Sequence, residues 1–189
     1  MNAKSVVVTG VSTGIGRGIV AALVRQGFRV FGTVRREVDA ASLRAEFGEA
    51  FTPLLADVTD DAAVRRAVES VRAALGEANL AGLVNNAGIS LVGPLLHQPL
   101  DDVRSQLDVN LIAPLRLVQA FAPLLGTDRR RQGGPGRIIN ISSVGGKIAI
   151  PLFFAAGPVS RRIRNVVKSS VSSRCGATDS PSNAVYVPR

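Results

Sequence analysis

Three glycines stand close together in the segment Thr9–Gly16, which reads TGVSTGIG. The segment follows a short β-branched run and precedes apolar residues at helical spacing, so it predicts a tight turn from a strand into a helix. Gly10 would permit the turn, and Gly14 and Gly16 would let backbone and helix approach closely. The free N–H groups at the start of such a helix bind a pyrophosphate. The pattern therefore predicts a dinucleotide site formed by Gly10, Ser12, Thr13, Gly14, Ile15 and Gly16.

The end of the next strand indicates which dinucleotide binds. An acidic residue at this place would hydrogen-bond the ribose 2′-OH of NAD, whereas arginines accept a 2′-phosphate. Here the sequence reads Thr33-Val34-Arg35-Arg36, with no acidic residue before Glu37. We therefore expect NADP(H), held by Arg35 and Arg36, with NAD as the alternative. The other open interpretation is that both arginines are solvated loop residues.

Further motifs follow in an order that is informative as a whole. Asp57-Val58 ends a third strand, Asn85-Asn86-Ala87-Gly88 ends a fourth, Asp108-Val109-Asn110-Leu111 lies in a helical stretch, and a fifth strand leads into Ser142-Ser143-Val144-Gly145-Gly146. Together with the glycine turn, this series over about 150 residues resembles the short-chain dehydrogenase/reductase family. The resemblance implies further cofactor contacts from Asp57, Val58, Asn86, Ala87 and Gly88.

The resemblance also implies a reaction, namely hydride transfer between NADP(H) and a small-molecule carbonyl or secondary alcohol. Ser143 would hydrogen-bond the substrate oxygen, and Asn110 would help to orient a water chain. In the family a tyrosine thirteen residues after the serine moves the hydroxyl proton, and a lysine four residues further lowers its pKa. Those two positions hold Ala156 and Ser160 here, and a register based on Gly157-Pro158 gives Val159 for the tyrosine.

Loss of a positioned general acid costs about 10²–10⁴-fold in rate. We therefore expect this chain to be a catalytically impaired oxidoreductase. Tyr186 is the only tyrosine, and no helical pattern surrounds it. The alternative function is that of a non-catalytic NADP(H)-binding protein, either a sensor or a module that binds a partner.

The elements that must position these residues alternate regularly along the chain. Strands are expected at residues 4–9, 28–34, 51–56, 80–84 and 137–141, and helices at residues 14–27, from about 39, after 59, 100–111 and 114–125. Thr59 or Asp60 would cap the third helix. The alternation predicts an α/β fold, a doubly wound parallel sheet of Rossmann type with helices on both faces. The sheet is expected to be incomplete at its C-terminal side, where the fifth strand becomes an exposed edge.

The pattern stops near Phe154. Residues 1–154 are expected to form the Rossmann-type dinucleotide-binding domain, whereas residues 155–189 contain no Leu, Glu or Phe and carry 6 basic and 1 acidic side chains. Two interpretations of residues 155–189 stay open. One is a disordered basic tail, and the other is an out-of-frame end of a truncated or frameshifted enzyme.

Composition limits the remaining functions. The net charge of +9 is concentrated in residues 155–189, which lack interleaved aromatics, so no nucleic-acid partner is expected. No apolar run approaches a membrane span, and no metal site is predicted. With one cysteine and no recognisable signal peptide, the expected location is the cytoplasm. A homo-oligomer is typical of the family, but the dimerisation helix is not recognisable in this sequence.

Overall fold

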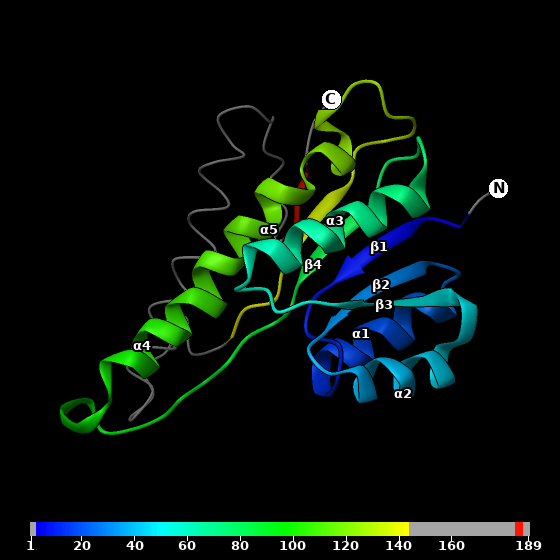
Figure 1. The fold of residues 1–189 in the computed structure, drawn as a ribbon. Helices are drawn as coiled ribbons and strands as arrows, with labels where there is room; N and C mark the ends of the chain where they lie inside the picture. The colour runs from blue at the N-terminus through cyan, green and yellow to red at the C-terminus, as the bar shows by residue number, and fades with distance from the viewer. Residues whose placement is uncertain (1–2, 144–183, 187–189) are drawn as a thin grey trace.

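The computed structural model describes residues 3–143 and 184–186, which are arranged around one twisted sheet (Figure 1). The strand order is β3-β2-β1-β4-β5-β6, and the strands from β3 to β5 are parallel. This confirms the predicted Rossmann-type sheet. The strand bounds are β1 Ser5–Val8, β2 Arg29–Val34, β3 Phe51–Leu55, β4 Gly82–Asn85, β5 Arg137–Asn140 and β6 Ala184–Tyr186.

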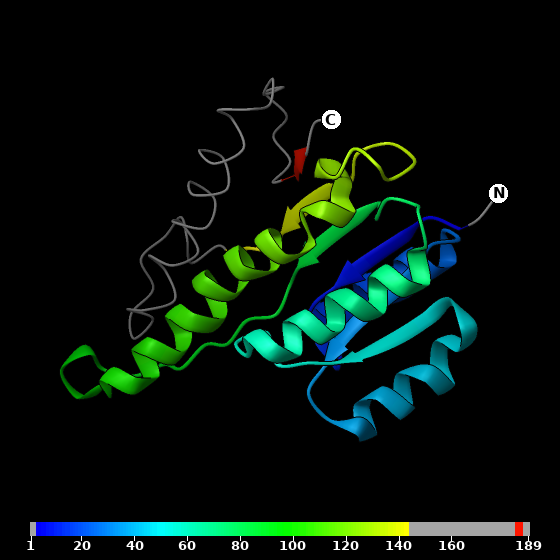
Figure 2. The same cartoon turned by 45° about the horizontal axis from the view of Figure 1, so that its top comes forward.

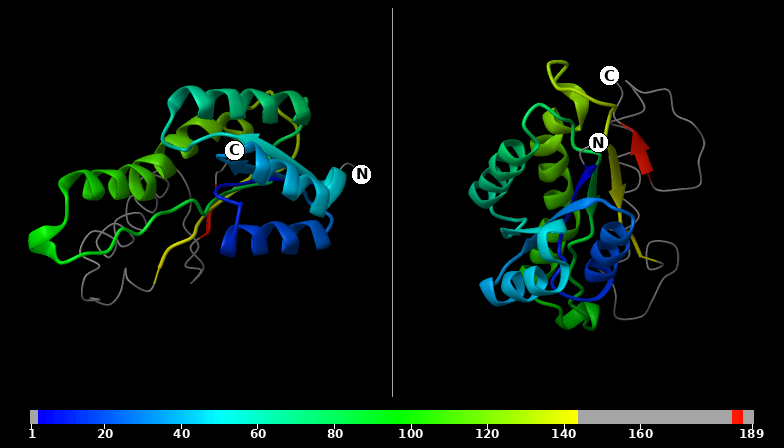
Figure 3. Two further views of the ribbon diagram at one scale, coloured as in Figure 1. Left: turned by 60° about the horizontal axis from the view of Figure 1, so that its bottom comes forward. Right: turned by 90° about the vertical axis from the view of Figure 1, so that its right-hand side faces the viewer.

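Helices cover both faces of the sheet, as the alternating pattern predicts. α1 and α2 lie on one face, and α3 and α5 lie on the other (Figure 3). The helix bounds are α1 Gly14–Arg25, α2 Glu37–Phe47, α3 Asp61–Leu75, α4 Leu100–Leu107 and α5 Ala113–Phe121. Shorter helical turns are η1 Gly48–Ala50, η2 Leu95–His97, η3 Asp108–Ile112 and η4 Pro123–Thr127, of which η3 and η4 are π-type.

The core divides along the pleat of the strands. Val6 and Val8 of β1 pack in the cluster beneath α1 and α2, whereas Val7 packs in the cluster beneath α3 and α5. Successive side chains of a strand point to opposite faces, so a strand covered on both sides must be apolar throughout. Burying each valine fully contributes about 1.5–3 kcal/mol. The run of valines therefore fixes β1 in the middle of the sheet.

α3 forms as its sequence pattern predicts. Val64, Ala67, Val68 and Val71 are buried on one stripe of the helix. Of the two expected caps, Asp60 takes the role, because its Oδ1 accepts from the N–H of Ala62 at 2.8 Å and of Ala63 at 3.2 Å. The neighbouring Thr59 donates to Asp57 instead.

One expectation about the second half of the chain is wrong, and another is confirmed with an added detail. β5 is not an exposed edge, because β6 pairs with it antiparallel, with Ile138 opposite Val185. The helical stretches expected at 100–111 and 114–125 are present as α4 with η3 and as α5 with η4, and η3 joins α4 directly to α5. Pro114 has no N–H to return to the carbonyl of Asn110, and the chain accommodates it with the wide π turn η3 rather than by ending the helix. The expectations for residues 144–183, including Ala156 and Ser160, lie outside the described residues.

Candidate functional site

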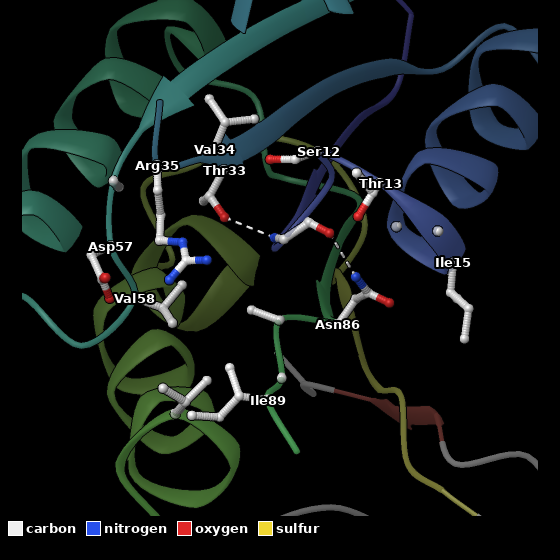
Figure 4. Close-up of a pocket in the computed structure, with 17 residues that line it drawn as sticks. Ser12, Thr13, Ile15, Thr33, Val34, Arg35, Asp57, Val58, Asn86 and Ile89 are labelled. Atoms are coloured by element: carbon white, nitrogen blue, oxygen red, sulfur yellow. Dashed lines mark hydrogen bonds between the residues drawn. The ribbon is translucent and has the colours of Figure 1, made fainter. Parts of the chain in front are cut away.

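A cleft of about 400 Å³ opens where β1, β2 and β4 end (Figure 4). β1 and β4 are neighbours, but the chain leaves them toward opposite halves of the sheet, and ligands of such sheets bind at this switch point. The cleft brings together all the predicted cofactor-binding residues except Arg36. Those that line it are Gly10, Ser12, Thr13, Gly14, Ile15, Gly16, Arg35, Asp57, Val58, Asn86, Ala87 and Gly88.

The glycine turn is packed too tightly for side chains at two of its positions. Gly10 has φ +67°, and a Cβ there would lie 2.8 Å from the Cα of Ala87. A Cβ on Gly16 would overlap the carbonyl oxygen of Gly10 and lie 2.6 Å from Nδ2 of Asn86. Gly14 differs from the expectation, because a Cβ there would meet nothing within 4 Å and the requirement is its φ of +58°. Glycine is therefore required at position 14 for its positive φ angle, and at position 16 because no space is left for a side chain.

The N-terminus of α1 is open to an anion. Its N-cap residue Thr13 makes no side-chain capping hydrogen bond, and the first turn contains no acidic residue. The first N–H groups of a helix have no partner within it and carry a partial positive charge. Since Thr13, Gly14 and Ile15 line the cleft, this end of the helix fits a pyrophosphate.

A polar network joins the turn to the residues that follow β4. Oγ1 of Thr9, a residue only 1% exposed, accepts from the N–H of Asn86 at 3.0 Å and of Ala87 at 2.9 Å. In return, Nδ2 of Asn86 donates to the carbonyl oxygens of Thr9 at 2.9 Å and of Gly10 at 3.0 Å. The N–H of Gly10 donates to Oγ1 of Thr33 at 3.0 Å (Figure 4). Asn86 therefore fixes the floor of the cleft.

The two arginines after β2 have different surroundings. The guanidinium of Arg35 points into the cleft on the side of Asp57 and Val58 (Figure 4). Arg36 does not line the cleft, and its Nε and Nη2 donate to the carboxylate of Asp39 at 2.9 and 2.7 Å. These bonds from Arg36 hold the pKa of Asp39 below its usual value, with a smaller contribution from a hydrogen bond from Ser12. Of the two arginines, Arg35 is therefore the one that faces the cleft.

Asp57 sits beside Arg35 as a charged acceptor. Partial burial opposes its ionisation, but hydrogen bonds from the hydroxyl and the N–H of Thr59, together with the charge of Arg35, outweigh it. The pKa of the Asp57 carboxyl is therefore lowered. The distances from Thr59 to Oδ1 are 2.7 and 2.9 Å. Asp57 is thus ionised at neutral pH, and Thr59 holds its carboxylate through two hydrogen bonds.

Neither of the two predicted catalytic residues lines the cleft. Asn110, in η3, uses its amide on the backbone of Ile89: its Oδ1 accepts from the N–H at 2.9 Å and its Nδ2 donates to the carbonyl at 2.8 Å. Ser143 is exposed and follows the carboxyl end of β5. Five residues that line the cleft were not predicted from the sequence. Four of them are apolar and directly adjoin a predicted site residue, and the fifth, Thr33, lies in β2. The five are Thr33, Val34, Ala56, Ile89 and Val109.

The described residues contain neither a cluster of metal ligands nor a membrane-spanning helix. Within residues 3–143 and 184–186, no group of three or more His, Cys, Asp or Glu side chains is placed to hold a metal ion. Among the helices in that same part of the chain, none is both long and apolar enough to cross a membrane.

Comparison with known proteins agrees with the observed fold. A profile of the short chain dehydrogenase family matches residues 4–155. The chain is 39% identical over 154 residues to an NADPH-dependent 3-dehydrocapnine reductase of Ornithobacterium rhinotracheale, and the match covers 82% of this chain and 53% of that protein. The chain spans about half the length of the curated relatives it matches.

Solved structures give the same result. A short-chain dehydrogenase from Streptomyces avermitilis superposes with a TM-score of 0.82 at 30% identity, over 92% of this chain and 61% of that one. A gluconate 5-dehydrogenase from Burkholderia cenocepacia J2315, in complex with NADP and tartrate, superposes with a TM-score of 0.80 at 29% identity, over 92% of this chain and 67% of that one.

Proposed function

The chain belongs to the short-chain dehydrogenase family, and from this membership we propose that its cleft binds NADP(H) for hydride exchange with a small carbonyl compound or secondary alcohol. One observation carries the proposal: Arg35 points into a cleft that also holds the open N-terminus of α1. The cofactor would supply or accept the hydride. The names of two similar proteins, one NADPH-dependent and one in complex with NADP, support the preference for the phosphorylated cofactor.

Each side of the cleft has a separate task in this proposal. The N–H groups at Gly14 and Ile15 bind the pyrophosphate, and Gly16 keeps the helix close enough to do so. The guanidinium of Arg35 binds the 2′-phosphate, while Asp57 and Val58 flank the adenine end. Ser143 would hydrogen-bond the substrate oxygen, and Asn110 would help to orient a water chain.

Cofactor titration tests the binding step. The chain is titrated calorimetrically with NADP⁺ and with NAD⁺, and we expect NADP⁺ to bind about tenfold or more tightly, since a hydrogen bond to a charged group contributes about 1.5–3 kcal/mol. Arg35→Ala should abolish the preference. Arg36→Ala, the matched control, should change it little because Asp39 already pairs with Arg36. Equal affinities for the two dinucleotides would contradict the proposal.

The second candidate function is a non-catalytic NADP(H)-binding protein, and the sequence observation that favours it is Ala156 and Ser160 at the positions of the family's tyrosine and lysine. A variant with Ala156→Tyr and Ser160→Lys, within a helix-forming replacement of residues 155–189, separates the two. Gain of NADPH oxidation with a panel of carbonyl compounds supports an impaired oxidoreductase. Reading the gene in all three frames after the Phe154 codon tests the out-of-frame interpretation.

A further inference from the structure

A buried amide lies one helical turn before Asn110. Gln106 in α4 has an exposed fraction of 0%, and its amide makes two hydrogen bonds to a single residue. Its Oε1 accepts from the N–H of Leu91 at 3.1 Å, and its Nε2 donates to the carbonyl of Leu91 at 3.1 Å. Nε2 of Gln98 donates to the same carbonyl at 2.8 Å. The position of Leu91 is therefore held from two sides.

The amides of Gln106 and Asn110 bind the backbone of Leu91 and Ile89 in the same way, and we call these two pairs of hydrogen bonds the amide ladder. Residues four apart on a helix are separated by about 6 Å along its axis, and residues two apart in an extended chain are separated by about 6.6 Å. Gln106 and Asn110 therefore match Leu91 and Ile89 in spacing. Figure 2 shows the geometry: the segment after β4 runs out beside α4, and the helix returns alongside it.

The amide ladder replaces a missing strand partner. Residues 86–94 are extended without belonging to any strand, so no strand among the described residues provides partners for their backbone groups. Each amide side chain presents one acceptor and one donor, as a neighbouring strand would, and satisfies both groups of one residue. Since Ala87, Gly88 and Ile89 line the cleft, the amide ladder sets where that wall of the cleft stands.

We propose that Gln106 is a positioning residue for the cofactor. It does not line the cleft. It fixes Leu91, and together with Asn110 it holds the wall from Gly88 to Ile89 against the cofactor. The inference rests on the proposed NADP(H) site, and it adds a residue whose effect on binding passes entirely through the backbone of another segment.

The test is the variant Gln106→Met, which keeps the length of the side chain and removes both hydrogen bonds. We expect NADP⁺ to bind about tenfold more weakly, measured by calorimetry well below the melting temperature of each protein. Hydrogen exchange at the Leu91 amide should also accelerate in the free protein. The matched control is Val68→Ala, a core truncation in α3, which should lower the melting temperature and leave the affinity for NADP⁺ unchanged.

The outcomes separate this inference from the proposed function. If the unmodified chain binds no NADP⁺, both are overturned. If it binds NADP⁺ and Gln106→Met binds equally well, only the inference is overturned, because Gln106 then has a structural role like that of Val68. Should Gln106→Met fail to fold, Gln98→Ala removes one donor to the Leu91 carbonyl. This milder variant should weaken NADP⁺ binding about two- to threefold, and unchanged binding overturns the inference.

Discussion

Two segments form walls of the cleft, and they are held in place by different means. Thr9–Gly16 leaves β1 and turns into α1 within a few residues, using positive φ angles at Gly10 and Gly14. Residues 86–91 leave β4 as an extended chain outside any strand. That segment is held by side chains from elsewhere, chiefly Thr9, Gln106 and Asn110.

The difference explains what each wall demands of the sequence. A turn that closes on itself requires particular residue types at fixed local positions, because only glycine adopts positive φ without strain. An extended segment tolerates most residue types, provided that distant side chains satisfy its backbone. The first wall can therefore be recognised locally, whereas the second depends on residues from other elements.

The largest expected effect comes where the two walls meet. Thr9→Val leaves the N–H groups of Asn86 and Ala87 without their acceptor. We expect the free energy of unfolding to fall by about 2–4 kcal/mol, measured by urea denaturation, because each unsatisfied group costs about 1–3 kcal/mol. Thr9→Ser keeps the oxygen and should lose much less. Equal losses in the two variants would show that the walls are not joined through this hydroxyl.

The next effect is confined to the first wall. Gly16→Ala places a Cβ against the carbonyl of Gly10 and the amide of Asn86, so we expect a loss of about 1–3 kcal/mol in stability together with weaker NADP⁺ binding. Gly18→Ala is the control on the same helix, since a Cβ there meets nothing within 4 Å. That control should stabilise the protein by about 0.5–1 kcal/mol. If Gly16→Ala and Gly18→Ala change the stability by the same amount, the turn is not closely packed at Gly16.

A third side of the cleft extends the comparison. Nη1 of Arg116, in α5, donates to the carbonyl of Val58 at 3.1 Å, and its guanidinium also pairs with Asp61. A helix thus again holds a cleft segment from outside. Arg116→Met should weaken NADP⁺ binding about three- to tenfold in calorimetric titration. The control Arg104→Met removes only an exposed pair with Asp101. If Arg116→Met binds NADP⁺ with unchanged affinity, the hydrogen bond from Arg116 is not needed to position Val58 in the cleft.

The smallest effect concerns pH. Neither Thr9–Gly16 nor residues 86–91 contain an ionisable side chain, so the Thr9 and Gly16 effects should not depend on pH. Asp57 differs, because its folded-state pKa is lowered. Its ionisation therefore stabilises the fold above the unfolded pKa of about 3.9, and this stabilisation is lost as pH falls through the folded pKa.

Urea denaturation of the unmodified chain and of Asp57→Asn between pH 3 and 7 measures the Asp57 contribution. The difference in unfolding free energy between the two should be constant near neutral pH and shrink on acidification below about 3.9. A difference that grows on acidification would mean that the pKa of Asp57 is raised rather than lowered.

Much of the fold and part of the site follow from the sequence because the signals are local. The valines of β1, the apolar stripe of α3 and the glycine turn each need specific residue types at short spacing. The choice between Thr59 and Asp60 as the cap of α3 needed the structure, since both are suitable and adjacent. The difference between Arg35 and Arg36 also needed the structure, because the hydrogen bonds from Arg36 to Asp39 draw Arg36 away from the cleft that Arg35 lines.

By itself, then, the sequence determined the alternation of strands and helices, the parallel sheet and the place of the glycine turn at its switch point. Only the tertiary structure decided that β6 pairs antiparallel with β5, that Pro114 is absorbed in a π turn, and that Gln106 and Asn110 hold the wall after β4. The physical reason is separation along the chain. Backbone geometry and periodicity act over a few residues, whereas the partner of a backbone N–H or carbonyl is chosen by the folded arrangement, at any distance in sequence.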